Sequence, residues 1–279
     1  HAESRSFMII SQTPYRVSFA GGGTDLAAFY REEPGAVLSV TINQHMYVTV
    51  HRRFGDDYRV AYSRTEIVDQ PSQLQHELVR EALRITGVNE PVEITTIGDV
   101  PAGTGMGSSS SLTAGLLVAL HGYQGVLTDR ERLAREACQI EIERLGKPIG
   151  KQDQYAAAYG GLNHIRFLPD ESVVVEPVPA LSGTLRELER RTLLIFTEQT
   201  RSADAILRRQ SASTNDRRAV LRRMRDLAGE MRAMLCGSGD LDGFADLLHD
   251  GWELKRSLGN GITNARVDDW YAAARALGA

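Results

Sequence analysis

The sequence is poor in features that define several classes of protein. It has only two cysteines among 279 residues, Cys138 and Cys236, and they stand far apart. Two isolated cysteines form neither a disulfide framework nor a metal cluster, and such usage is typical of a reducing cytoplasm. No apolar run approaches the roughly 18 residues that a membrane-spanning helix needs. We therefore expect a cytoplasmic protein that makes no contact with a membrane.

The chain also lacks an excess of positive charge. Its formal net charge is −4 at pH 7, so there is no basic field of the kind that attracts nucleic acid. Arginines are dense over residues 208–232, but acidic residues alternate with them, which favours a solvated helix face. The seven histidines show no metal-ligand spacing, so we expect no zinc or iron site. The apolar fraction of 42% is ordinary for a globular enzyme.

The pattern of apolar residues predicts an α+β fold, because strands and helices do not alternate as they do around a parallel sheet. A composition change near residues 180–190 predicts two domains, at 8–185 and 186–279. Runs of β-forming residues predict strands at 8–20, 36–42, 46–54, 58–63, 91–97 and, as a buried strand, 191–196. Helical periodicity predicts helices at 72–87, 112–120, 128–145 (opened by a Thr128–Glu131 capping box), 202–212, 215–236 and 240–258.

One segment has an unusual composition. Residues 100–112 read "VPAGTGMGSSSSL", with three glycines at alternate positions and then four serines. A glycine-rich loop before a helix gathers unpaired backbone N–H groups at the positive end of the helix dipole, and that arrangement binds phosphate. It is not a Walker A loop, because no lysine follows Gly107. The alternative is a tight turn that caps a helix.

Two further segments accompany this one, and the order along the chain is "TPYRVSFAGGGTDL" (13–26), "PAGTGMGSSSS" (101–111) and "GKQDQ" (150–154). With these motifs the sequence resembles the GHMP kinase superfamily over residues 12–279, and most of all its sugar 1-kinase branch, which phosphorylates heptose 7-phosphate. The resemblance implies the GHMP kinase fold, with an N-terminal ribosomal-protein-S5-domain-2-like part that binds ATP. It implies a ferredoxin-like C-terminal part of helices and strands.

One motif of the family is missing. GHMP kinases usually carry a third glycine-rich motif, of Gly-Ala-Gly-Gly-Gly-Gly type, near the C-terminus. This sequence stops at "AAARALGA", about where that motif would begin. We therefore expect the natural chain to continue beyond Ala279. A GHMP-fold protein that binds ligands without turnover is the alternative.

The resemblance assigns catalytic roles to two residues. Asp153 in "GKQDQ" would act as general base or orienting group for the acceptor hydroxyl, since a carboxylate within hydrogen-bond reach can accept its proton. Arg16 would keep that carboxylate ionised and touch the γ-phosphate. Without the motif, Asp153 would be an aspartate that caps a helix, and Arg16 would be a surface residue.

The resemblance also assigns residues to the acceptor sugar. Asp25 matches the family's sugar-recognising aspartate, and its alternative is a residue that caps a glycine-rich turn. Galactokinase has Glu-His where Gly22 and Gly23 stand, so this site has more room, as a bulkier or differently branched sugar requires. Lys255 and Arg256 in "ELKRSL" would face a remote phosphate or form a solvated helix end. The substrate contacts are thus expected to be Gly22, Gly23, Thr24, Asp25 and Arg201.

ATP and Mg²⁺ are the implied cofactors. Glu141 shares an apolar helical stripe with Leu133 and Ala137, and a carboxylate on such a face needs a partner or a cation. The resemblance makes Glu141 and Ser109 the magnesium ligands, whereas an ordinary buried ion pair is the alternative for Glu141. The phosphates of ATP would bind to Gly103, Thr104, Gly105, Met106, Gly107, Ser108, Ser109 and Ser110.

Taken together, the motifs imply an ATP-dependent sugar kinase. The expected reaction converts D-glycero-D-manno-heptose 7-phosphate to the 1,7-bisphosphate, which would supply activated heptose for lipopolysaccharide or capsule. Another acceptor, such as galactose, fucose or a mannose-like hexose, is the alternative. The expected partners are the sugar phosphate and ATP, and a homodimer is compatible with the resemblance.

Overall fold

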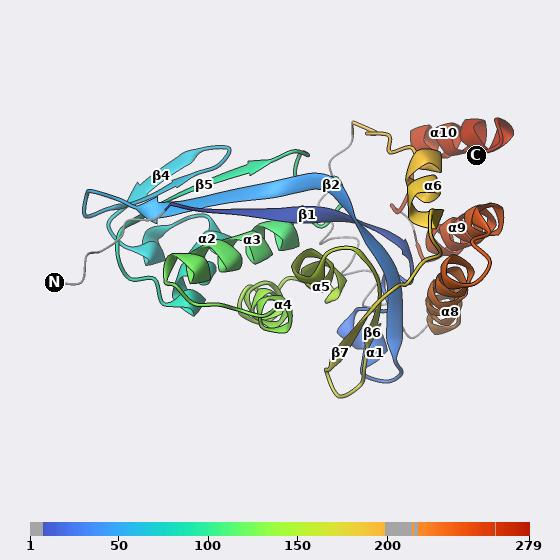
Figure 1. Ribbon diagram of the computed structural model, residues 1–279, viewed down its shortest axis with the longest axis horizontal. Coiled ribbons are helices and arrows are strands. Elements are labelled where there is room, and N and C mark those ends of the chain that lie inside the picture. The colour runs from blue at the N-terminus through green and yellow to red at the C-terminus, as the bar shows by residue number, and fades with distance from the viewer. Residues whose placement is uncertain (1–7, 199–213, 215–216, 260) are drawn as a thin grey trace. The chain divides into compact units, whose positions relative to one another are not determined.

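The computed structural model describes residues 8–198, 214, 217–259 and 261–279 (Figure 1). The expected α+β class is confirmed. The strands are β1 (Ile9–Ala20), β2 (Gly35–Arg52), β3 (Tyr58–Ala61), β4 (Thr65–Val68), β5 (Val92–Gly98), β6 (Leu162–Phe167) and β7 (Val173–Pro177). The helices are α1 (Ala27–Tyr30), α2 (Glu77–Thr86), α3 (Ser108–Tyr123), α4 (Arg130–Cys138), α5 (Gln152–Tyr159), α6 (Thr184–Arg191), α8 (Arg218–Cys236), α9 (Leu241–Ser257) and α10 (Ala265–Ala276), with a 3₁₀ turn η1 (Pro71–Gln73) and a π-helical turn η2 (Gln139–Arg144).

The chain forms two compact units, and each is assembled from separate stretches of sequence. The first unit takes residues up to Arg16, Thr41–Lys147 and Asp153–Gly160, and the second takes Val17–Val40, Pro148–Gln152 and the residues from Gly161 onwards. The long strand β2 contributes to both, because its first part pairs with β6 and its last part pairs with β5. The domain division expected at residues 185 and 186 stays a prediction.

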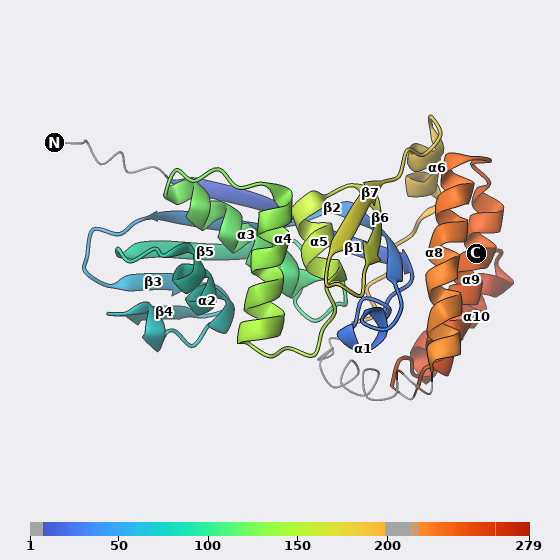
Figure 2. The same cartoon turned by 90° about the horizontal axis from the view of Figure 1, so that it is seen from below.

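In the first unit, a sheet is covered on one face by α2, α3 and α4 (Figures 1 and 2). Its strands follow the order β4-β3-β5-β2, with β1 beside β2. Strands β3 and β5 are parallel, whereas β2 and β5 are antiparallel. The apolar face of α3 packs against the sheet, and the fully buried residues of this core include Val48, Val50, Ile94, Leu116, Leu117 and Leu120.

In the second unit, β2, β6 and β7 form an antiparallel ladder. Leu38 and Leu162 from this ladder share a core with Leu227 and Met231 of α8 and with Phe244 of α9. The arginines of α8 were expected on a solvated face, and two of them are half-exposed. Arg222 pairs with Glu33, and Arg223 pairs with Glu230. None of the helices that the structure describes is long and apolar enough to span a membrane.

Three local expectations need correction. The strands expected at 36–42 and 46–54 are parts of the single strand β2. The helix expected from residue 112 begins at Ser108, so the four serines form its first turn. The helix expected at 128–145 is capped by Asp129, not Thr128, because the Asp129 carboxylate accepts the Arg132 backbone N–H at 2.7 Å. That helix changes from α to π at Gln139.

The buried strand expected at Arg191–Phe196 is wrong. Helix α6 ends at Arg191, and residues 192–197 have no regular structure. Leu193 is 80% exposed and Phe196 is 53% exposed. The run consists of good β-formers, but a strand also needs a partner for its backbone, and no described residue pairs with this segment. Beyond residue 186 the regular elements among the described residues are helices. The helix expected at 202–212 lies outside the described residues.

Candidate active site

The glycine–serine run forms a loop and the first turn of α3. Gly103, Gly105 and Gly107 have φ angles of 79°, 77° and 73°, in the left-handed region that favours glycine. Gly107 occupies the N-cap position, and no side chain caps the helix. The N–H groups of the first turn therefore have no intrahelical acceptor. Such an uncapped N-terminus is suited to bind an anion.

An ion pair between Arg16 and Asp153 lies against this loop. Arg16 Nε donates to Asp153 Oδ1 at 2.8 Å, and Nη2 lies 2.6 Å from the same oxygen. Arg16 belongs to β1, and Asp153 is in the first turn of α5. The Arg16 side chain is 11% exposed and that of Asp153 is 24% exposed. The carboxylate is thus held by a cation and still reaches the surface.

The same arginine holds the glycine loop. Arg16 Nη1 donates to the Gly105 carbonyl at 2.7 Å, and the Arg16 backbone N–H donates to the Met106 carbonyl at 3.2 Å. A Cβ atom added at Gly107 would lie 3.4 Å from Arg16 Cγ and 3.4 Å from Asp153 Oδ2. The loop, Arg16 and Asp153 are therefore neighbours in the first unit, as the motifs predicted.

Glu141 is buried beside this cluster and is held by neutral donors. It lies in η2 and is 0% exposed. Its Oε1 accepts from Thr113 Oγ1 at 2.6 Å and from Ser109 Oγ at 3.3 Å. Its Oε2 accepts from Ser110 Oγ and from Gln154 Nε2, both at 2.9 Å. Among the described residues no lysine, arginine or histidine forms an ion pair with Glu141. The described residues therefore do not support the alternative of an ordinary buried ion pair.

Burial raises the pKa of the Glu141 carboxyl, and the negative charge of Asp153 adds to the rise. The hydroxyl donors of Thr113 and Ser110 and the positive charge of Lys147 oppose it. A metal ion would oppose it further. The donor set fits magnesium, which prefers carboxylate and hydroxyl oxygens. Ser109 makes the longest of the four bonds, so its hydroxyl is the one released most readily to a cation.

Sequence reasoning missed two partners of Glu141. Thr113 lies four residues after Ser109, which places both on one face of α3. Its role was hidden because the helix was expected to begin at Leu112. Gln154 stands beside Asp153 in "GKQDQ", and its Oε1 atom is buried without a hydrogen-bond partner among the described residues. The motif itself was therefore the signal for Gln154.

The segment from Gly21 to Asp25 lies in the second unit. Asp25 is 3% exposed, and its carboxylate accepts from the Gly23 backbone N–H at 2.9 Å and from that of Gln152 at 3.3 Å. Thr24 is 0% exposed, and its hydroxyl contacts the backbone of Gly21 and Ala36. The Thr24 hydroxyl therefore holds the loop from inside, and its contact with the substrate stays a prediction. Arg201 lies outside the described residues.

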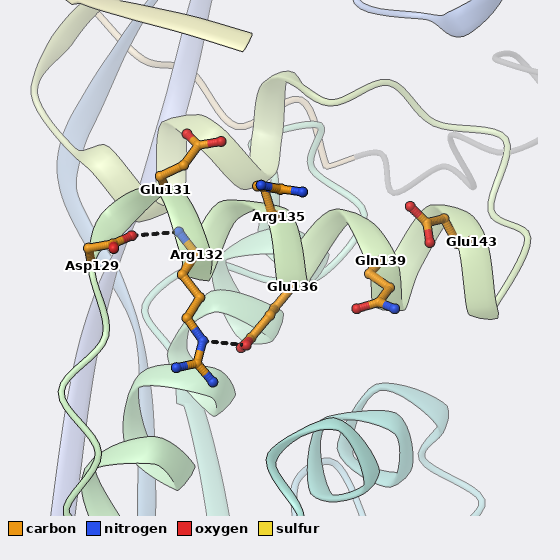
Figure 3. A pocket seen from close by; sticks show the side chains of 7 residues that line it. All are labelled: Asp129, Glu131, Arg132, Arg135, Glu136, Gln139 and Glu143. Atoms are coloured by element: carbon orange, nitrogen blue, oxygen red, sulfur yellow. Dashed lines mark hydrogen bonds and ion pairs between the residues drawn. The ribbon is translucent and has the colours of Figure 1, made fainter. Parts of the chain in front are cut away.

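A hollow of about 480 Å³ lies elsewhere in the first unit, along α4 and η2. Its lining side chains stand in a row on one helical face, as Figure 3 shows, and Arg132 donates to Glu136 at 2.7 Å. Asp129, Arg132, Arg135 and Glu143 are exposed there. Among these described lining residues the ion pair is that of Arg132 with Glu136, and none of the residues predicted for the active site lines this hollow.

A comparison with known protein families shows which family has these residues in its sequence pattern. The profile of the GHMP kinases N terminal domain matches residues 74–161, which include the glycine–serine run, Glu141 and Asp153. Residues 74–161 thus match the N-terminal domain of the GHMP kinases. The chain is 29% identical over 286 residues to D-glycero-alpha-D-manno-heptose 7-phosphate kinase of Campylobacter jejuni, a match that covers 95% of this chain and 82% of that one.

Solved structures agree with this family. A D-glycero-D-manno-heptose 1-phosphate kinase of Bacteroides thetaiotaomicron superimposes with a TM-score of 0.78 at 29% identity, over 90% of this chain and 79% of that one. Phosphomevalonate kinase of Streptococcus pneumoniae, at 16% identity and a TM-score of 0.69 over 90% of this chain and 80% of that one, shows the shared fold. The expected GHMP kinase fold is confirmed, and the protein is a phosphotransferase with an alcohol group as acceptor.

The environment of Glu141 predicts how stability depends on pH. Its pKa is raised in the folded state, so folding disfavours ionisation, and this penalty grows as the pH rises from the ordinary carboxyl value of 4.5 through the folded-state pKa. Glu141→Gln removes the ionisation but keeps the shape. We expect the free energy of unfolding of wild type, relative to Glu141→Gln, to fall with rising pH in metal-free urea titrations. A difference independent of pH would show that Glu141 ionises without penalty.

Proposed function

We propose that this kinase transfers the γ-phosphoryl group of ATP to the anomeric hydroxyl of D-glycero-D-manno-heptose 7-phosphate. The product would be the 1,7-bisphosphate, a precursor of activated heptose for lipopolysaccharide or capsule, made in the cytoplasm. The observation that carries the proposal is the contact of the Arg16–Asp153 pair with an uncapped, glycine-rich helix N-terminus. The name of the Campylobacter relative, a heptose 7-phosphate kinase at 29% identity, supports this acceptor, and the name of the Bacteroides structure supports a heptose phosphate more broadly.

In this proposal Asp153 accepts the proton of the acceptor hydroxyl. Phosphoryl transfer depends on positioning and on stabilising charge, so the acceptor oxygen must be oriented as its proton leaves. Arg16 holds Asp153 through two contacts to one oxygen, which leaves Oδ2 for the acceptor. The guanidinium also provides positive charge beside the loop on which the transferred group would lie.

The loop of residues 103–107 and the first turn of α3 would bind the phosphates of ATP. Uncapped N–H groups and the helix dipole favour the negative charge of the phosphates. Ser109 and Glu141 would hold Mg²⁺, which neutralises charge on the phosphate oxygens when bound. Asp25, Gly22 and Gly23 would recognise the sugar, and galactose, fucose or a mannose-like hexose remains the alternative acceptor.

The acceptor is tested directly with a panel of sugars and sugar phosphates. Release of ADP is measured for each compound, and the position of the new phosphate is assigned by ³¹P NMR. We expect the heptose 7-phosphate to give the highest kcat/KM and a product phosphorylated at the anomeric oxygen. A higher kcat/KM for a free hexose would mean that this hexose, and not the heptose 7-phosphate, is the acceptor. If no compound led to ADP release, the non-catalytic alternative would be favoured.

Asp153→Asn tests the proton acceptor. The amide keeps the shape of the carboxylate but cannot take up the proton, so kcat should fall by about 100-fold or more, while ATP affinity changes little. Asp129→Asn is the matched control, because Asp129 is an exposed helix cap at which asparagine serves equally well. Turnover of Asp153→Asn near that of the control would remove Asp153 from the mechanism.

Gly105→Val tests the phosphate loop. A β-branched side chain is strained at a φ of 77° and would reshape the loop, so we expect calorimetric titration to detect no ATP binding. Gly125→Val is the matched control: its φ is 73°, and both glycines have open space where a Cβ would stand. Ser109→Ala keeps the backbone N–H groups and should bind ATP nearly as wild type does. Normal ATP affinity in folded Gly105→Val would mean that the phosphates bind elsewhere.

A further inference from the structure

Lys255 contacts the glycine loop of the second unit. It lies in the last turn of α9, where a lysine is favoured by the helix dipole. Its ammonium nevertheless reaches a different segment, because Nζ donates to the Gly22 carbonyl at 3.2 Å, 233 residues away in sequence. The next residue, Arg256, donates to Glu253 at 2.9 Å and lies 3.6 Å from Asp268. Of the two cations in "ELKRSL", Lys255 is therefore the one beside the loop.

Neither the backbone conformation nor the packing at Gly22 requires a glycine. At Gly21 the φ is +88°, and a Cβ would lie 1.9 Å from the Ala36 carbonyl oxygen, so only glycine fits. At Gly22 the φ lies outside the left-handed region, and a Cβ would meet only Gln152 Nε2, at an ordinary 3.7 Å. Among the described residues, the space in front of Gly22 is therefore open. Glycine at this position keeps that space clear.

Gln152 lies next to this space, because its Nε2 atom is the one that a Cβ at Gly22 would meet. Its Oε1 atom is buried and has no hydrogen-bond partner among the described residues, while its backbone N–H donates to Asp25. The Nε2 amide can donate to a hydroxyl oxygen of a ligand in front of Gly22. An amide donor thus borders the space, and the Lys255 cation contacts the same glycine.

We propose that Gly22, Gln152 and Lys255 form a subsite for the phosphate-bearing end of a sugar phosphate. The Lys255 ammonium binds the phosphate ester, and Gln152 Nε2 donates to the oxygen of a neighbouring sugar hydroxyl. An ammonium has three N–H donors, so one lysine can bond to the Gly22 carbonyl and to a phosphate oxygen together. This inference rests on the proposed function and names the residue that would distinguish the sugar phosphate from the free sugar.

A comparison of two acceptors tests Lys255. Heptose 7-phosphate and the same heptose without phosphate are assayed with wild type, Lys255→Met, Lys255→Arg and Arg256→Met. Loss of a charge-assisted bond should lower kcat/KM for the phosphate ester by roughly 10- to 100-fold, mainly through KM. Activity on the free heptose should be nearly unchanged, because it has no phosphate for the ammonium to bind. Lys255→Arg should retain most of the discrimination, and Arg256→Met should retain all of it.

An equal loss for both acceptors would overturn the proposal, because it would mean that Lys255 only shapes the loop, and no loss for either would do so as well. Calorimetric titration of heptose 7-phosphate into wild type and Lys255→Met separates this inference from the proposed reaction, since binding needs no turnover. Weaker binding to Lys255→Met supports the subsite even if wild type transfers no phosphoryl group to this sugar. Equal affinity of both proteins would overturn the subsite while leaving the proposed reaction intact.

Discussion

The ion pair between Arg16 and Asp153 is the interaction on which the geometry of the candidate site depends. Its partners are 137 residues apart, on β1 and α5, and the same guanidinium also holds the carbonyl of Gly105. One side chain therefore fixes a strand, a loop and a helix. A planar group with five N–H donors can do this, whereas the single ammonium of a lysine would not span the same acceptors. Removal of either partner would leave a half-buried charge without its neutralising group, which costs more than the pair itself contributes.

The two carboxylates of the site differ in environment, and this difference suits them to different tasks. Asp153 reaches the surface and is paired with a cation. Glu141 is fully buried among four neutral donors, with a raised pKa. Gln154 follows Asp153 directly and donates to Glu141, so the first turn of α5 positions both carboxylates. A surface carboxylate can meet a substrate hydroxyl, whereas a buried one can only hold what lies against it.

The sequence predicted the components of the site better than their connections. Motif order pointed to Arg16, the loop and Asp153, and these residues are neighbours in the structure. Thr113 was missed because composition placed the start of α3 four residues late, and helix starts depend on backbone conformation at the N-cap. The strand predicted at residues 191–196 was wrong for a different reason. Its residues favour a strand locally, but strand formation depends on a partner that no local pattern reveals.

The first turn of α3 shows why composition alone was ambiguous. The positive φ angles of Gly103, Gly105 and Gly107 would require glycine in a plain turn as much as in a phosphate loop. The missing cap does not separate the two cases either, because α1, α2, α6 and α8 also begin without a side-chain cap, and α6 has glycine at the N-cap as α3 does. The surroundings of α3 are more informative. The serines of its first turn point their hydroxyls to Glu141 and to Pro14, and Arg16 holds both the preceding loop and Asp153. A turn that also needs a buried carboxylate and a half-buried ion pair beside it departs from what a plain helix start requires, and such departures are expected where a ligand binds.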